Sequence, residues 1–417
     1  MSINPSVAVD TVNKTHMPVS NGDTLYVGGS GPDNYTKIQD AIDNASDGDT
    51  VFVYAYSSPY YESIEIDKTI NLIGENKDTT IINGSGTGDV VSVDADWVNV
   101  SGFTVQNSGA NWGDAGIEIL SNNTNICDNI INFNRDGIFL WYVNKNTIKD
   151  NIISDNGKSI MLWSSNRNTI VYNTFFDAGF YFHYSYHNIV YSNMINDKPL
   201  IYLENAYDRI LESNAGQIIL IRCDNITVQH QEITNTNICI ELLETRNCII
   251  ANNTFSLNKV LAIDMIDSYK NIITDNNIFD NKAGISLHHS HKNNITNNSI
   301  SKNYQGIKLT YYSDQNIIKS NNILDNKFGI QLDYSDSNSI TKNNFINHIK
   351  NAYFQTPYKF STNTWLLNYW RRPRSLPKLI IGMRWISFGQ YGDHLIPWVM
   401  FDWHPAKEPY DIEVGIV

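Results

Sequence analysis

Short apolar segments alternate with asparagine-rich punctuation along most of the chain. The clearest stretch runs from Asn293 to Leu332, where two copies of nearly the same pattern follow each other. Each copy holds three apolar segments of two to four residues, and Asn or Gly separates them. No segment is long enough for a helix, and Asn and Gly are poor helix formers. Because so short a unit cannot bury a core alone, the pattern predicts that the copies stack.

The punctuation recurs about every 22 residues, with single gaps between 17 and 24 residues. A second series, Gly-Ile-x-Leu, keeps the same register, for example at Gly137 and Gly306. Three short strands in about 22 residues suit one coil of a parallel β-helix, whereas a leucine-rich repeat needs a Leu-rich consensus that this chain lacks. The marks of the successive copies are the second residue of each Asn pair or its substitute: Asn129, Asn151, Asn173, Asn193, Asn214, Gln231, Asn253, Asn277, Asn298, Asn322 and Asn344.

Two properties of asparagine explain its place in such a repeat. Each strand must end in a tight bend, and Asn tolerates the left-handed backbone conformation better than other non-glycine residues. Stacked coils also place like residues about 4.8 Å apart, so that side-chain amides can hydrogen-bond along the column.

The pattern divides the chain into three parts. Residues 1–23 are predicted to be a flexible lead, residues 24–362 the repeat, and residues 363–417 an irregular C-terminal cap rich in Trp and Pro. Residues around 35–46 have apolar positions at helical spacing, and this helix is expected to cover the open end of the stack. The weakest repeat lies between Asn205 and Glu244, where a distorted coil is expected.

Charge and composition limit the classes of partner. The 417 residues carry a net charge of −13, which argues against nucleic acid and against an anionic membrane surface. The chain has no stretch long and apolar enough for a membrane span. It does not open with an apolar signal sequence, and we expect a mature secreted or cell-surface protein from which the signal has been removed. The frequent Asn-x-Ser/Thr sequons fit glycosylation, but an Asn-rich repeat also makes them by accident.

Several motifs together resemble the right-handed β-helix proteins of the pectin-lyase-like superfamily. They are Tyr26-Val27-Gly28-Gly29, Ile38-Gln39-Asp40-Ala41-Ile42, Gly48-Asp49-Thr50-Val51 and Ile70-Asn71-Leu72-Ile73-Gly74. The Asn-x-Ile and Gly-Ile-x-Leu repeats are similar to the NosD-type and carbohydrate-binding, sugar-hydrolase branch, and to archaeal surface proteins. The resemblance implies an all-β fold, a single right-handed parallel β-helix of three parallel sheets and about a dozen coils. It also implies a polysaccharide or surface-glycan partner, and calcium or copper as candidate ions.

One aromatic row is the first candidate site. If Ile138 and Leu140 point inward, their neighbours point outward, and the same register extends to the following coils. A row of exposed aromatic side chains is costly unless it is covered or used, and sugar rings stack on such faces. The predicted glycan-binding residues are Phe139, Trp141, Trp163, Tyr181, His183, Tyr202 and Glu204. The alternatives are a covering loop or chain, or a register shifted by one residue.

Two weaker clusters have other chemistry. His288, His289 and His291 could bind copper or zinc, although neighbours on a strand face opposite ways unless the run lies at a turn. A lyase or hydrolase would need a base and acidic groups, for which Lys308, Asp333, Glu241 and Asp264 are the candidates. No enzyme motif of the superfamily transfers residue by residue. The sequence therefore predicts a glycan-binding or structural surface protein, with a polysaccharide lyase or glycoside hydrolase second and a copper-handling protein third. It does not define the oligomeric state.

Overall fold

The computed structural model describes residues 22–356, 362–387 and 393–412. The described chain is a right-handed parallel β-solenoid of about 16 turns, which confirms the predicted fold class. Its one α-helix, α1 (Ile38–Asn44), lies against the first strands and buries Ile38, Ala41 and Ile42. A short 3-10 helix, η1 (Ala55–Ser57), follows the second strand. No described helix is long and apolar enough to cross a membrane.

The coils form two successive stacks, and the first stack has three parallel sheets. Sheet A contains β1 (Thr24–Val27), β2 (Thr50–Val53), β4 (Asn71–Gly74), β7 (Asn99–Ser101), β10 (Asn125–Cys127), β13 (Thr147–Lys149), β16 (Thr169–Val171) and β19 (Ile189–Tyr191). Sheet B contains β5 (Ile81–Asn83), β8 (Thr104–Gln106), β11 (Ile130–Asn132), β14 (Ile152–Ser154), β17 (Thr174–Phe176) and β20 (Met194–Ile195). Sheet C contains β3 (Ile64–Ile66), β6 (Val91–Val93), β9 (Ala115–Ile119), β12 (Asp136–Trp141), β15 (Lys158–Trp163) and β18 (Phe180–His183).

The second stack also has three rows of strands. Sheet D contains β21 (Lys198–Glu204), β23 (Gln217–Ile221), β26 (Ile238–Leu243), β29 (Leu261–Ile266), β32 (Ala283–His288), β35 (Gln305–Thr310), β38 (Phe328–Asp333), β41 (Lys350–Thr356) and β44 (Lys378–Ser387). Sheet E contains β22 (Tyr207–Leu211), β24 (Asp224–Gln229), β27 (Ile249–Ala251), β30 (Ile272–Thr274), β33 (Asn294–Thr296), β36 (Ile317–Lys319), β39 (Ser339–Thr341), β42 (Thr364–Leu366) and β45 (Asp393–Asp402). Sheet F contains β25 (Glu232–Thr234), β28 (Thr254–Ser256), β31 (Asn277–Phe279), β34 (Ser299–Ser301), β37 (Asn322–Leu324), β40 (Asn344–Ile346) and β43 (Tyr369–Trp370).

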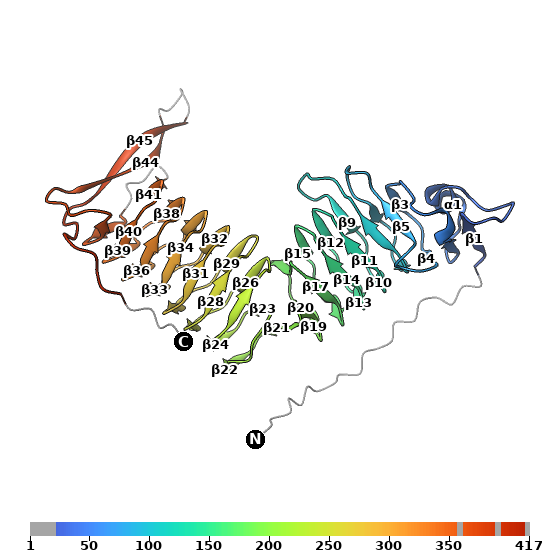
Figure 1. Cartoon of the computed structure of the whole chain (residues 1–417), viewed down its shortest axis with the longest axis horizontal. Helices are drawn as coiled ribbons and strands as arrows, with labels where there is room; N and C mark the ends of the chain where they lie inside the picture. Colours follow the sequence, from blue (N-terminus) through green and yellow to red (C-terminus); the bar gives the residue numbers. More distant parts are fainter. Residues whose placement is uncertain (1–21, 357–361, 388–392, 413–417) are drawn as a thin grey trace, which may run out of the picture.

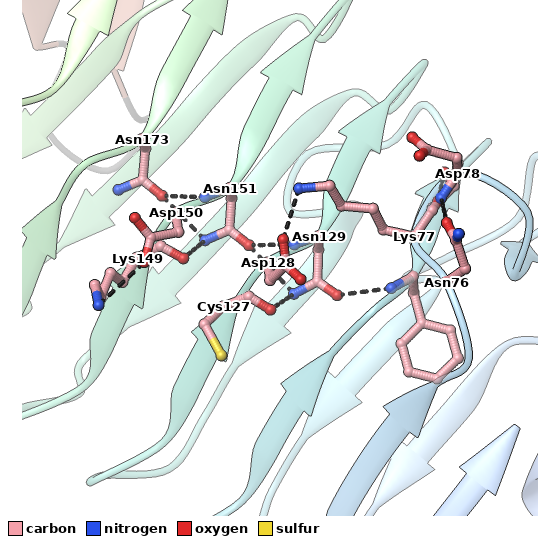
Figure 2. Close-up of polar contacts among 12 residues, drawn as sticks. Asn76, Lys77, Asp78, Cys127, Asp128, Asn129, Lys149, Asp150, Asn151 and Asn173 are labelled. Carbon is pink, nitrogen blue, oxygen red and sulfur yellow. Dashed lines mark hydrogen bonds and ion pairs between the residues drawn. The ribbon is translucent and has the colours of Figure 1, made fainter.

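Buried amide ladders hold successive coils together at their corners. In Figure 2, the Asn129 N–H donates to Asn151 Oδ1 and the Asn151 N–H donates to Asn173 Oδ1, each at 3.0 Å. Each side-chain amide then donates to backbone carbonyls; Asn151 Nδ2 lies 2.9 Å from Ile126 O. These side chains are fully buried, or nearly so, but their polar atoms are paired. The predicted amide column is therefore present.

The detailed placement of the column corrects the sequence marks in two ways. The left-handed residue is the one before each ladder Asn: Asp150, for example, has φ 56°. The ladder therefore explains the Asn at the marked positions, while Asn also occupies some of the left-handed positions, such as Asn252 and Asn297. Three marks of the second stack are displaced by one residue. The ladder members there are Asn276, Asn321 and Asn343, not Asn277, Asn322 and Asn344. The mark Asn214 lies outside the ladder and is exposed.

The chain interrupts the solenoid where the sequence pattern is weakest. β20 is followed by β21 in antiparallel pairing, and β21 then pairs with β23 rather than with β18. The two stacks consequently form the two arms of a V (Figure 1). The apolar end of the first arm, including Phe180 and Phe182, packs in one cluster with outward side chains of the second arm: Ile219, Ile221, Leu243 and Ile266.

Side chains of the second arm also satisfy the free edge of β18. The Phe180 N–H donates to Gln217 Oε1, and Gln217 Nε2 donates back to Phe180 O, both at 2.9 Å. The Phe182 N–H donates to the Glu241 carboxyl at 3.1 and 3.2 Å. Polar side chains thus replace the strand that a continuing solenoid would have supplied, which keeps these buried backbone groups paired.

Candidate binding site at the junction of the two arms

The strands of sheet C run from β3 through β12 and β15 toward the junction of the arms (Figure 1). On the outer face of this sheet, Trp141, Trp163 and Tyr181 are partly buried, whereas Phe139 is almost fully buried. Strand register aligns Phe139 with Met161, and Trp141 with Trp163, while Ile138 and Leu140 belong to the inner core. The Trp141 and Trp163 rings are stacked with centroids 5.6 Å apart. We call Trp112, Trp141, Trp163 and His183 the aromatic row.

Trp112 is a member of the row that sequence reasoning missed. It lies in the loop before β9 and is 57% exposed. Its ring contacts Trp141 and Trp163 edge-on, with centroid distances of 5.2 and 5.7 Å. The sequence shows Trp112 as a lone Trp between Gly109 and Gly113 in a polar loop. The repeat pattern predicts inward and outward positions only for strand residues, so it could not place this side chain on the outer face.

His183 ends the row next to the second arm. Its imidazole stacks on Trp163 with centroids 3.6 Å apart. Burial lowers the pKa of His183 to about 4, and His288 of the second arm adds to this effect while Asp267 opposes it. The ring is therefore neutral at neutral pH. Its Nδ1 is buried and makes no hydrogen bond within the described residues.

Two carboxyl groups of the second arm meet the aromatic face. Glu241 and Asp264 are register neighbours on β26 and β29, and both are buried. Burial raises the pKa of Asp264 to about 7, although a hydrogen bond with Ser286 opposes the shift. Burial, followed by the nearby Asp264 charge, raises the pKa of Glu241 well above its usual value. Both carboxyls also help to raise the pKa of Tyr181, which places them close to the outer face of sheet C.

A third carboxyl group lies at the outer end of the same face. Glu118 aligns with Phe139 in the strand register. Burial raises the pKa of Glu118 to about 7, with a further contribution from the neighbouring Asp89. Asp89 itself accepts a hydrogen bond from the Ala115 N–H at 2.6 Å. Protonated carboxyls can both donate and accept hydrogen bonds, as a sugar hydroxyl does.

The structure corrects the expected positions of Tyr202 and Glu204. They were assigned to the coil after Tyr181 and His183, but β18 does not pair with β21. Tyr202 instead packs on the apolar end of the first arm, 5.5 Å from the Phe182 ring, and donates to Glu204 Oε2 at 2.8 Å. Glu204 accepts from the His187 N–H. The predicted register is wrong here because the chain reverses direction where β20 pairs antiparallel with β21, between His183 and Tyr202.

Lys308 and Asp333 lie farther along sheet D than the junction carboxyls. Their strands are neighbours, but the register pairs Lys308 with Gln331 and Asp333 with Thr310. Asp333 accepts a hydrogen bond from Gln331 Nε2 at 2.6 Å, and burial raises its pKa. The four acid-base candidates are therefore spread over several coils of one face instead of meeting at one point.

The three histidines lie where β32 ends in a turn. His288 Nδ1 is 3.2 Å from Thr310 Oγ1, and His289 Nδ1 is 3.9 Å from Asp267 Oδ1. His291 stacks on Tyr269, with ring centroids 5.4 Å apart. The His288 and His289 rings also contact each other, with centroids 4.5 Å apart, whereas His291 makes its ring contact with Tyr269. Within the described ranges, no group of three or more His, Cys, Asp or Glu side chains is arranged to hold a metal ion.

Comparisons with solved structures give fold likenesses at low identity. The A-module of Azotobacter vinelandii mannuronan C-5 epimerase AlgE6 is 13% identical, with a TM-score of 0.33 over 79% of this chain and 87% of that one. XylC in complex with xylose is 12% identical, with a TM-score of 0.38 over 78% and 75% of the two chains. DFA-IIIase from Arthrobacter chlorophenolicus A6 in complex with GF2 is 12% identical, with a TM-score of 0.34 over 77% and 94%. A search of curated proteins found no match.

One family profile matches most of the chain. It is described as NosD, periplasmic copper-binding protein, and it matches residues 42–207 and 198–384. The two matched segments overlap where the chain passes from the first arm to the second. The chain belongs to the NosD family.

Proposed function

We propose that the junction binds a glycan chain, with the aromatic row as the stacking surface. One observation carries this proposal: the rings of Trp112, Trp141, Trp163 and His183 lie in continuous contact on one outer face, and His183 lies near Asp267 of the second arm. Such a surface combines apolar faces for sugar rings with a few polar groups for hydroxyls. Glu118 and Asp267 supply the polar groups that flank the row.

The test compares a double variant in the row with a matched aromatic variant elsewhere. Trp141→Ala with Trp163→Ala should weaken binding to oligosaccharides on a glycan array, and in titration calorimetry, by about tenfold or more, because two stacking rings are lost. Tyr207→Ala removes an exposed ring on β22, outside the row, and should leave binding unchanged. Equal binding by the wild type, the double variant and Tyr207→Ala would eliminate the proposal.

A polysaccharide lyase or glycoside hydrolase is the second candidate. The observation that favours it is that two separate carboxyls, Glu118 on β9 and Asp264 on β29, have pKa values that burial raises to about 7. Groups that titrate near the working pH can exchange protons with a substrate. Incubation with uronic and neutral polysaccharides would show either unsaturated product by ultraviolet absorbance or new reducing ends. Glu118→Gln should abolish the signal, and wild-type protein without any product would exclude this function.

The copper chemistry in the family description does not fit the described residues. Only two of the three candidate histidines, His288 and His289, lie against each other, and no group of three or more His, Cys, Asp or Glu ligands occurs in the described ranges. The family description does favour a location outside the cytoplasm. We infer that the protein is exported, and degradation by protease added to intact cells or spheroplasts would test this.

A further inference from the structure

The C-terminal hairpin has two faces of different character. β44 and β45 pair antiparallel over their whole length, so alternate residues share a face. One face includes Ile380 and Met400 and packs on the last coils of the second arm. The opposite face is apolar along both strands: Leu379, Ile381, Met383, Trp385, Leu395, Pro397, Val399 and Phe401. We call these eight residues the outer hairpin face.

Much of the outer hairpin face is open to solvent. Ile381 is 55% exposed and Val399 is 43% exposed, and Leu379 and Leu395 are exposed as well. The hairpin lies at the far end of the second arm, away from the junction (Figure 1). Nearby Ile349 and Leu376 are more exposed still. An apolar patch of this kind is typical of a docking surface.

The charge around the hairpin is opposite to that of the whole protein. Residues 337–417 hold nine Lys and Arg residues against five Asp and Glu residues, whereas the whole chain has 30 Lys and Arg residues against 43 Asp and Glu residues. Lys350 and Lys378 line a hollow of about 220 Å³ together with Ile349, Leu379 and Ile381. The C-terminal end is therefore basic although the whole protein carries a net charge of −13, and this end can attract an anionic surface.

Further basic side chains precede the first strand of the hairpin. Arg371 and Arg372 are exposed and directly follow Trp370, which lines the same hollow. Trp403 is exposed just after β45. Apolar side chains, Trp and a surrounding group of Lys and Arg are the combination that binds the headgroup region of an anionic bilayer. A second copy of this chain would place like charges together, which makes self-association less favourable.

We propose that the outer hairpin face and its basic margin dock on the surface of an anionic phospholipid bilayer. The contact would hold one end of the solenoid at the membrane and leave the junction of the arms free. This inference is independent of the proposed glycan site.

Vesicle flotation of the full chain tests the proposal directly. The protein should float with vesicles of phosphatidylcholine and phosphatidylglycerol at a ratio of about 7:3, but not with pure phosphatidylcholine, and high salt should weaken the binding. Arg371→Gln with Arg372→Gln should reduce vesicle affinity at least about fivefold. Ile381→Glu with Val399→Glu should reduce it more than about tenfold.

A matched variant and a folding check make these results decisive. Ile317→Glu changes an Ile of similar exposure, 45%, on β36 outside the hairpin, and should bind as the wild type does. All variants must keep the wild-type circular dichroism and melting temperature, which their exposed positions favour. The proposal is overturned if wild-type protein stays with neither vesicle type or binds both equally, or if Ile317→Glu loses as much affinity. It is also overturned if sedimentation shows a dimer that only the hairpin variant disrupts.

Discussion

At each corner of the solenoid, two consecutive residues have separate roles. Asp275, with φ 56°, turns the chain, and Asn276 joins its coil to the neighbouring ones. Asn276 Oδ1 accepts from the backbone N–H of Asn253 at 3.0 Å and from its side-chain amide at 2.9 Å. Asn276 Nδ2 donates to Ile250 O at 2.8 Å. Because these groups are buried, nearly all of them are paired; Asn338 Nδ2 is an exception among the described ladder residues.

Asn276→Ala should therefore lower the free energy of unfolding by about 2–4 kcal/mol, because it leaves several buried polar groups without partners. Asn277→Ala is the matched control, since Asn277 is the adjacent, half-buried residue that the sequence pattern favoured. The control should cost less than about 1 kcal/mol. Urea unfolding of the two variants measures the difference. Equal losses would show that the ladder is not the stabilising element.

Asp264 makes stability depend on pH at the junction. The folded-state pKa is raised to about 7, above the usual value near 3.8. The folded protein therefore holds a proton that the unfolded chain releases, and stability falls as pH rises from about 4 to about 7. Asp264→Asn should make this slope shallower, which a series of melting curves would show, while Glu118 and Glu241, whose pKa values are also raised by burial, maintain the rest of it. Asp280→Asn, at an exposed left-handed position, should retain the slope. A wild-type profile that rises over this range would contradict the prediction.

At the scale of elements, Asp402 joins the C-terminal hairpin to the last coil. It is fully buried and ends the amide ladder by accepting from the Asn368 N–H at 2.9 Å. It also accepts from Trp370 Nε1 at 3.0 Å and from the Leu367 N–H at 3.2 Å. A carboxylate thus pairs the donors that a further coil would have paired.

Asp402→Ala should loosen the hairpin before it affects the rest of the stack. We expect faster amide hydrogen exchange in β42 to β45 and a loss of about 2–4 kcal/mol locally, because three buried donors lose their acceptor. Exchange in β26 to β32 should stay as in the wild type. Asp411→Ala, at an exposed position in the C-terminal segment, is the control. Uniform acceleration along the whole chain would refute a local capping role.

The sequence predicted the core strands and the cap helix well, because a regular spacing of apolar residues defines each of them. Ile126, Ile148 and Ile170 align in the core as their spacing required, and the cap helix lies where Ile38 and Ile42 indicated it. The register failed where Asn pairs offered two equivalent marks and where the chain reverses after β20. Glu241 could not be assigned from sequence either, because its partner, the Phe182 N–H, is 59 residues away and belongs to the other arm.

At the scale of the whole molecule, the V depends on a few polar side chains and one apolar contact. Gln217 and Glu241 pair with the edge of β18, and Phe180 and Phe182 pack on outward Ile and Leu side chains of the second arm. Polar pairing fixes direction, whereas apolar packing is non-directional.

The double variant Gln217→Ala with Glu241→Ala should thus keep the arms attached but widen the range of angles between them. Small-angle X-ray scattering should show a larger maximum dimension, while circular dichroism stays unchanged. Gln229→Ala with Glu212→Ala removes a side-chain pair of the same chemistry on the exposed surface of the second arm and is the control. If both double variants scatter like the wild type, Gln217 and Glu241 do not set the angle. The apolar contact and the remaining polar links between the arms, such as Asn237 Nδ2 to Gly179 O at 2.9 Å and Tyr186 Oη to Glu244, are then sufficient.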